Sequence, residues 1–110
     1  MSKNAEKVTL GSGNVFADLG LKDADELLVK AGLVHRITKI IKQRKLRQVD
    51  TAELLGIDQP KVSKLLNGDL YGFSTLQIMH FLNALGQDVE IVVREPKRRK
   101  ARGKLTVQAT

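Results

Sequence analysis

The sequence predicts a mainly α-helical domain that ends in one β-strand. Three observations support this fold class. Apolar residues recur at spacings of three and four through four separate stretches between residues 23 and 86. Aromatic residues make up only 4% of the 110 residues, so the core is expected to consist of Leu, Ile, Val and Ala, which suit packed helices. Residues 88–94 instead alternate between apolar and polar side chains, which is typical of a strand.

The first helix is expected to begin near Asp23, whose side chain can cap it. Asp25 and Glu26 place negative charge in its first turn, where the helix dipole favours it. The expected buried face shows helical spacing and consists of Leu27, Ala31, Val34, Ile37 and Ile41. Before this helix, the apolar run over residues 14–21 is expected to be a short segment that docks on the domain.

Two short helices are expected next, the first over residues 47–55 and ended by Gly56. Asp58 can cap the second, and Pro60 falls in its first turn, where the missing N–H costs little. The pair Asn67-Gly68 ends it, because both residues tolerate positive φ.

A fourth helix is expected to begin after Ser74, which can cap it, and to end at Gly86. This helix is apolar around more of its circumference than one small core can easily cover. The strand over residues 88–94 also lacks a clear partner within the chain, since residues 105–107 are only a weak second candidate. A lone strand is not stable, so we expect it to pair with the same strand of a second subunit in a homodimer.

The segment from Arg47 to Gly68 carries the strongest functional signal. A small residue at Ala52 allows its two helices to cross closely, and Gly56 allows the chain to reverse between them. The angle between the helices is expected to be held by three apolar residues, Ile57, Val62 and Leu65. A fixed angle of this kind lets the second helix enter a major groove while the first crosses the DNA backbone.

This segment resembles the helix-turn-helix of the Cro/cI-type (XRE) repressor family. The matching positions are Gln48, Ala52, Gly56, Ile57, Val62, Leu65 and the pair Asn67-Gly68. The wider run over residues 14–94 is similar to a subgroup of XRE regulators and HigA-like antitoxins. The resemblance implies a lambda-repressor-like helix-turn-helix bundle that binds an inverted-repeat operator in double-stranded DNA and represses its own operon. An alternative is an antitoxin that also binds and neutralises a RelE/HigB-like toxin.

The resemblance implies DNA contacts for six residues: Gln48, Gln59, Lys61, Ser63, Lys64 and Tyr71. Gln48 lies at the start of the expected helix over residues 47–55, where its side chain and backbone N–H meet a phosphate. Gln59 takes the first outward position of the recognition helix, from which a Gln can pair with adenine. Lys61 and Ser63 take the next outward positions and can reach a base edge or a phosphate.

The remaining two contacts, of Lys64 and Tyr71, are expected at the sugar-phosphate backbone. Lys64 lies further along the recognition helix, and the Tyr71 hydroxyl reaches a phosphate unless its ring packs on the loop. Pro60 departs from the polar residue that is usual at its position and removes one base reader. The alternative for the glutamines and lysines is an ordinary solvent-facing role.

Other classes of function find little support in the sequence. His35 and His80 are the only histidines, and neither has a nucleophile or a carboxylate cluster near it in the sequence. Cysteine is absent, which excludes disulfides, thiolate metal sites and a Cys nucleophile. Two separated histidines are too few for a metal site, and no Gly-rich phosphate loop is present. We therefore expect no enzymatic activity, no cofactor and no metal.

The chain is expected to divide into three parts: a flexible segment 1–13, the domain 14–94, and a basic, disordered tail 95–110. Much of the net charge of +7 lies in the tail, at Lys97, Arg98, Arg99, Lys100, Arg102 and Lys104. A basic excess favours polyanions through counterion release, although a tail that only aids solubility is an alternative. No apolar run is long enough to span a membrane, and the N-terminal residues lack the apolar stretch of a secretory signal. A cytoplasmic protein is therefore expected, associated with the nucleoid through DNA binding.

Overall fold

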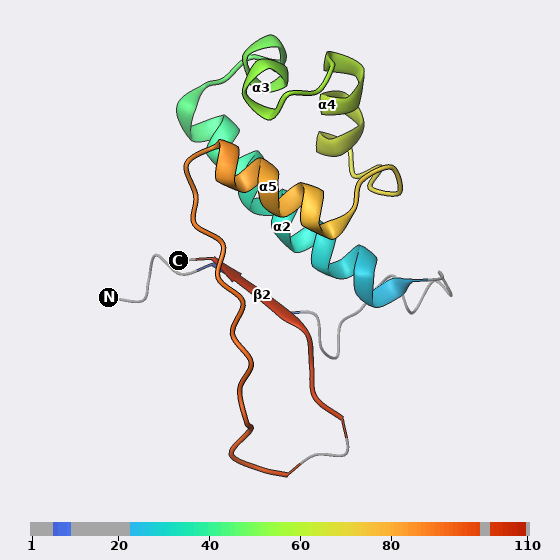
Figure 1. Ribbon diagram of the computed structural model, residues 1–110, viewed down its shortest axis with the longest axis vertical. Helices are drawn as coiled ribbons and strands as arrows, with labels where there is room; N and C mark the ends of the chain where they lie inside the picture. The colour runs from blue at the N-terminus through green and yellow to red at the C-terminus, as the bar shows by residue number, and fades with distance from the viewer. Residues whose placement is uncertain (1–5, 10–22, 100–101, 110) are drawn as a thin grey trace.

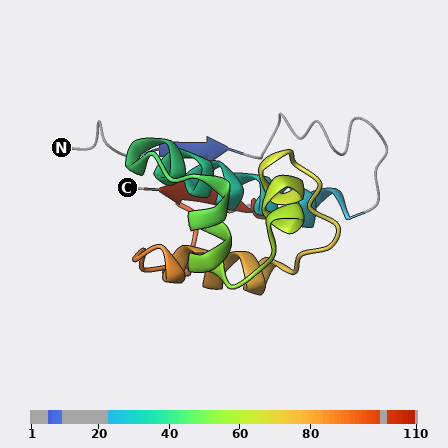
Figure 2. The ribbon, with the colours of Figure 1, turned by 90° about the horizontal axis from the view of Figure 1, so that it is seen from above.

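A computed structural model describes residues 6–9, 23–99 and 102–109, and this part of the chain is mainly helical, as predicted. Its elements are β1 (Glu6–Thr9), α2 (Ala24–Arg44), α3 (Gln48–Leu55), α4 (Gln59–Leu66), α5 (Thr75–Ala84) and β2 (Thr106–Ala109). Helices α2 and α5 pack on each other, and α3 and α4 lie together at one end of the molecule (Figure 1). The two strands lie on the other side of α2 from α3 and α4 (Figures 1 and 2).

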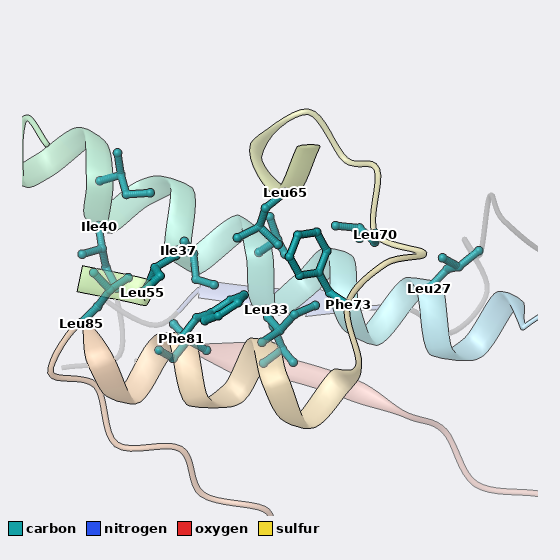
Figure 3. Packing of buried hydrophobic residues seen from close by; sticks show 14 residues of the cluster. Leu27, Leu33, Ile37, Ile40, Leu55, Leu65, Leu70, Phe73, Phe81 and Leu85 are labelled. Carbon is teal, nitrogen blue, oxygen red and sulfur yellow. The ribbon is translucent and has the colours of Figure 1, made fainter. Parts of the chain in front are cut away.

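The core is an aliphatic cluster in which α2 meets α4, α5 and the loop between those two helices (Figure 3). Four apolar side chains among the described residues have no exposed surface at all, namely Ile37, Val62, Leu65 and Ile78. Phe73 and Phe81 add an edge-to-face ring pair with centroids 5.9 Å apart. Burying one such aliphatic side chain contributes about 1.5–3 kcal/mol, so this cluster fixes α4 against α2 and, through Leu55, α3 against α5.

The helix boundaries follow the local signals in the sequence. The Asp58 carboxylate accepts a hydrogen bond from the Lys61 N–H at 2.9 Å, and Ser74 Oγ accepts one from the Gln77 N–H at 3.0 Å. Gly56 ends α3 with φ at 72°, a left-handed conformation that glycine adopts without strain. The predicted caps of α4 and α5 are thereby confirmed.

Asp23 marks the start of α2, but the prediction that its side chain caps the helix is wrong. The residue adopts a left-handed conformation with φ at 57°, and its side chain makes no capping hydrogen bond. The Asp23 carbonyl instead accepts a hydrogen bond from the Leu27 N–H at 2.9 Å. The left-handed backbone, which Asp tolerates better than most residues, explains why the carboxylate does not take the usual capping position.

The predicted strand over residues 88–94 is wrong, because the structure gives this segment no regular secondary structure. The strand ladder instead joins β1 and β2 of one chain in antiparallel register, with Val8 opposite Val107. The expectation of unstructured ends is therefore wrong for residues 6–9 and 106–109. The expected docking segment 14–21 lies outside the described residues.

Strand β2 is held on α2 by a close contact between Val107 and Gly32. The Val107 side chain packs against the core cluster, and a Cβ built on Gly32 would lie 3.0 Å from the Val107 Cβ. Gly32 is buried in the middle of α2, where glycine costs the helix roughly 1 kcal/mol relative to alanine. The glycine therefore allows the sheet to approach the helix.

Replacing Gly32 by alanine is expected to displace β2, because the new methyl group would overlap Val107. Hydrogen exchange of the amides of residues 106–109 should accelerate in Gly32→Ala and slow again in the double variant Gly32→Ala/Val107→Ala. Exchange in the core of α2 should not accelerate, since alanine favours the helix. Unchanged exchange of the β2 amides in the single variant would contradict the close contact.

Candidate nucleic-acid interface

Helices α3 and α4 form a compact pair joined by a three-residue turn. Their inner faces are buried through Ala52, Leu55, Val62 and Leu65. The turn is closed by two hydrogen bonds to the Ala52 carbonyl, from the N–H of Gly56 at 2.9 Å and from the N–H of Ile57 at 3.1 Å. Ala52, the left-handed Gly56 and the buried Val62 and Leu65 thus lie where the sequence pattern predicts them, whereas Ile57 is half-buried.

The start of α3 carries an ion pair that the sequence analysis missed. Arg47 Nε and one Nη lie 3.0 and 3.1 Å from the two carboxylate oxygens of Asp50, and the Arg47 N–H donates to the same carboxylate at 3.0 Å. Behind them, the fully buried Thr51 donates its hydroxyl hydrogen to the Arg47 carbonyl at 3.0 Å. The three-residue spacing of a capping box was the signal that could have found this pair.

This ion pair shifts the titration of both partners. The hydrogen bonds from the Arg47 side chain and backbone lower the pKa of Asp50 below its ordinary value of 3.8, and the same carboxylate raises the pKa of Arg47. A carboxylate whose pKa is lowered by folding adds stability above its unfolded pKa and loses it as the pH falls through the folded pKa.

The Asp50→Asn variant should therefore be slightly less stable than the native chain at neutral pH. The difference should shrink as the pH falls from 3.8 through the lower pKa of the folded carboxylate, because protonation then removes the charge that the variant lacks. Both side chains are solvent-accessible, so the effect is small and should weaken with salt. Urea unfolding of both proteins at neutral and acidic pH measures it, and a difference that grew on acidification would contradict the sign.

The outward face of the helix pair holds the residues predicted to contact DNA. Gln48, Gln59, Lys61 and Lys64 are exposed, and Tyr71 is 65% exposed in the loop after α4. Ser63 is half-buried, and its hydroxyl lies 3.4 Å from the side-chain nitrogen of Asn67. The Lys61 N–H is already bound to the Asp58 cap, so Lys61 offers a ligand its ammonium group alone.

Two surface hollows show which of these residues the fold brings together. Gln59 and Lys61 share an open groove of about 580 Å³ between α3 and α4 with Val49, Glu53 and the turn. Lys61 also lines a smaller hollow of about 120 Å³ on the other side of α4 with Lys64, Phe73 and Gln77. Lys61 is thus common to both hollows, whereas Gln48, Ser63 and Tyr71 line neither.

The described residues show no feature of an enzyme or metal site. His35 on α2 and His80 on α5 are both exposed. Among the described residues, no three His, Asp or Glu side chains lie close enough together to hold a metal ion. No helix in this part of the chain is both long enough and apolar enough to span a membrane.

The packed pair α3 and α4, with one exposed polar helix, defines a helix-turn-helix protein, a class that binds DNA. The chain belongs to the helix-turn-helix domain family, whose family model matches residues 15–94. A solved structure described as an XRE family transcriptional regulator superposes with a TM-score of 0.75 and 44% sequence identity. That match covers 80% of this chain and 99% of the other.

A second relative is a Mycobacterium tuberculosis (strain ATCC 25618 / H37Rv) protein assigned as antitoxin HigA3. It is 39% identical over 70 residues, which are 63% of this chain and 64% of the relative. The resemblance of the sequence to XRE-type, HigA-like helix-turn-helix regulators is therefore confirmed.

Proposed function

We propose that this protein is a DNA-binding transcriptional regulator that recognises an inverted repeat in double-stranded DNA and represses its own operon. The observation that carries the proposal is the rigid pairing of α3 with α4, which leaves Gln59, Lys61 and Lys64 exposed on one short helix. Helix α4 is the recognition helix of the matched family and enters the major groove, while α3 crosses the backbone.

The proposed contacts divide into base reading and backbone binding. Gln59 stands at the first position of α4 and pairs with a base edge, and Lys61 reaches guanine or a phosphate. Gln48 opens α3, where the positive end of the helix dipole favours a phosphate. Ser63 reaches either a base edge or a phosphate, while Lys64 and Tyr71 contact the sugar-phosphate backbone and carry little sequence information.

We further propose that the protein acts as a homodimer. Helix α5 and the segment after it expose large apolar side chains that a second copy would cover. Leu76 is 61% exposed, Ile91 75% and Val93 94%. Two copies place their recognition helices about 34 Å apart, in successive major grooves. Sedimentation at micromolar concentration should give the mass of two chains, and a monomer at that concentration would contradict the dimer.

Binding to the DNA upstream of the protein's own gene, compared with random DNA of equal length, tests the proposed regulation. Affinity should favour the upstream DNA by at least about 1,000-fold and should fall steeply as salt increases. Equal affinity for both DNAs would contradict specific regulation and would leave only charge-driven binding.

A second role as an antitoxin is favoured by the relative assigned as HigA3. In this role the protein also binds and neutralises a RelE/HigB-like toxin and still represses its operon through α4. A toxin-like reading frame next to the gene, together with co-purification of the two products, would support this role. Absence of a complex between the co-expressed products would contradict it.

A further inference from the structure

The described basic residues beyond position 93 lie in a closed loop and not in a free tail. After α5 the chain leaves the helical body, runs away from α3 and α4, and returns to β2 (Figure 1). Leu85, with 1% exposure, anchors the chain before the loop, and Val107 on Gly32 anchors it after the loop. The pairing of β2 with β1 fixes the second anchor further.

In this loop, which spans residues 94–104, the described residues 94–99 and 102–104 are all exposed and form a strongly cationic group. Its nine described residues include six cations, which are Arg94, Lys97, Arg98, Arg99, Arg102 and Lys104, against the one carboxylate of Glu95. Arg102 lies 3.6 Å from the Asp25 carboxylate, which ties this side of the loop to the start of α2. Positive charge is therefore concentrated on a surface that is held in place at several points.

The loop and the recognition helix lie at opposite ends of the molecule. Figure 1 shows α3 and α4 at one end of the longest axis, which measures 47 Å, and the basic loop at the other. When α4 enters a major groove, the loop of the same subunit faces away from that duplex. Its charge is thus placed for a second polyanion.

The composition of the loop favours phosphates over a protein surface or unpaired bases. Residues 94–104 contain no large apolar side chain and no aromatic ring. A protein interface needs such anchors at its centre, and single-stranded binding relies on aromatic stacking. Closely spaced lysines and arginines are sufficient to bind the phosphates of a double helix without reading its sequence.

We propose that loop 94–104 is a second, sequence-independent nucleic-acid-binding surface, which holds the phosphate backbone of a double helix other than the one that α4 occupies. That this surface acts beside another one rests on the proposed function of α4, whereas nucleic-acid binding by the loop does not depend on α4. One protein molecule would then connect two double-helical segments.

The first experiment measures affinity for a random-sequence DNA duplex across a salt series. The triple variant Lys97→Gln/Arg98→Gln/Arg99→Gln should reduce the slope of log K against log salt by about 2–3, because each phosphate contact contributes about 0.9. An unchanged slope would overturn the proposal. The variant Lys42→Gln/Arg44→Gln/Lys45→Gln removes equal charge from the exposed end of α2 and tests whether general charge loss explains the effect. An equal fall in both variants would also overturn it.

The second experiment tests whether the loop holds a different duplex. The preferred upstream duplex is immobilised and loaded with protein, and capture of a labelled random duplex is measured. The native protein should capture it, while the loop variant should stay on the immobilised duplex and capture at least tenfold less. Equal capture by both proteins would overturn the proposal. Binding of both proteins to poly-glutamate is measured as well. If the loop variant lost binding to poly-glutamate but kept its affinity for the random duplex, the proposal would also be overturned, and an acidic protein would be the indicated partner.

Duplex RNA and duplex DNA as competitors then identify the source of the phosphates. Competition by either duplex supports the proposal, and the stronger competitor names the class of partner. Competition by neither duplex would overturn it. If the protein did not prefer the upstream DNA, only the proposed function of α4 would be contradicted. The test of the loop would still stand, because the salt slope of the loop variant is measured on random DNA.

Discussion

Replacing Leu65 by alanine is expected to lower the free energy of unfolding by about 2–5 kcal/mol, which is a large share of the stability of a small domain. Leu65 has no exposed surface and lies in the core cluster beneath α4 (Figure 3). Its removal leaves a cavity between the recognition helix and α2. Because the same contact positions α4, DNA affinity should fall even under conditions in which the variant remains folded.

Leu54→Ala is the matched control, since Leu54 lies one helix earlier and is 46% exposed. Its unfolding free energy should stay within roughly 0.5 kcal/mol of the native value. Urea unfolding of the native protein and the two variants measures their unfolding free energies. Titration with DNA, at urea concentrations below the unfolding transition, measures the loss of DNA affinity in Leu65→Ala. A Leu65→Ala protein as stable as Leu54→Ala would contradict the central place of Leu65 in the core.

The helices could be predicted because their signals are local. Asp58 and Ser74 each act on a backbone N–H three residues away, and Gly56 ends α3 through its own backbone angle. The buried side of α4 follows from the helical spacing of Val62 and Leu65. Interactions of this kind need no knowledge of the rest of the fold, so they can be read from a few neighbouring letters.

The strands could not be predicted in the same way, because their stability comes from distant parts of the chain. Each strand has four residues, and Glu6 pairs with Ala109 at the other end of the chain. Val107 gains its position from Gly32, 75 residues earlier in the chain, and a contact over that separation leaves no local signal in the sequence. The stronger alternation over residues 88–94 finds no paired strand among the described residues, which shows that a ladder requires a partner as well as a pattern.

The candidate site was predicted as a surface but not in its internal pairing. Helical spacing is sufficient to identify Gln59, Lys61 and Lys64 as outward residues. The three-residue spacing of Arg47 and Asp50 signals a capping box, but the two-pronged ion pair between their side chains also depends on the rotamers that these solvent-accessible groups adopt. Lys30, which lies on α2 outside the candidate site, forms another pairing that the sequence does not reveal. It is buried, its ammonium nitrogen lies 3.1 Å from the Glu26 carboxylate, and it donates a hydrogen bond to the Leu70 carbonyl at 3.5 Å.

The double variant Gln59→Ala/Lys61→Ala is expected to lose much of its preference for the upstream duplex over random DNA. Base-reading contacts contribute about 1–3 kcal/mol each, which corresponds to roughly 5- to 150-fold in relative affinity per residue. Gln59 and Lys61 share the groove between α3 and α4, so we expect their effects to be non-additive. Both side chains are exposed, and the unfolding free energy should therefore change by less than roughly 0.5 kcal/mol.

The matched control is Lys42→Ala/Gln43→Ala, which removes the same two side-chain types from exposed positions on α2. This variant should keep its preference for the upstream duplex, and any loss should be equal on both DNAs. Competition titrations of the upstream and random duplexes at one salt concentration measure the preference directly. If Gln59→Ala/Lys61→Ala lost affinity equally for both duplexes, its two residues would contact phosphates, and base reading would have to lie elsewhere on α4, since phosphate contacts carry no direct sequence information.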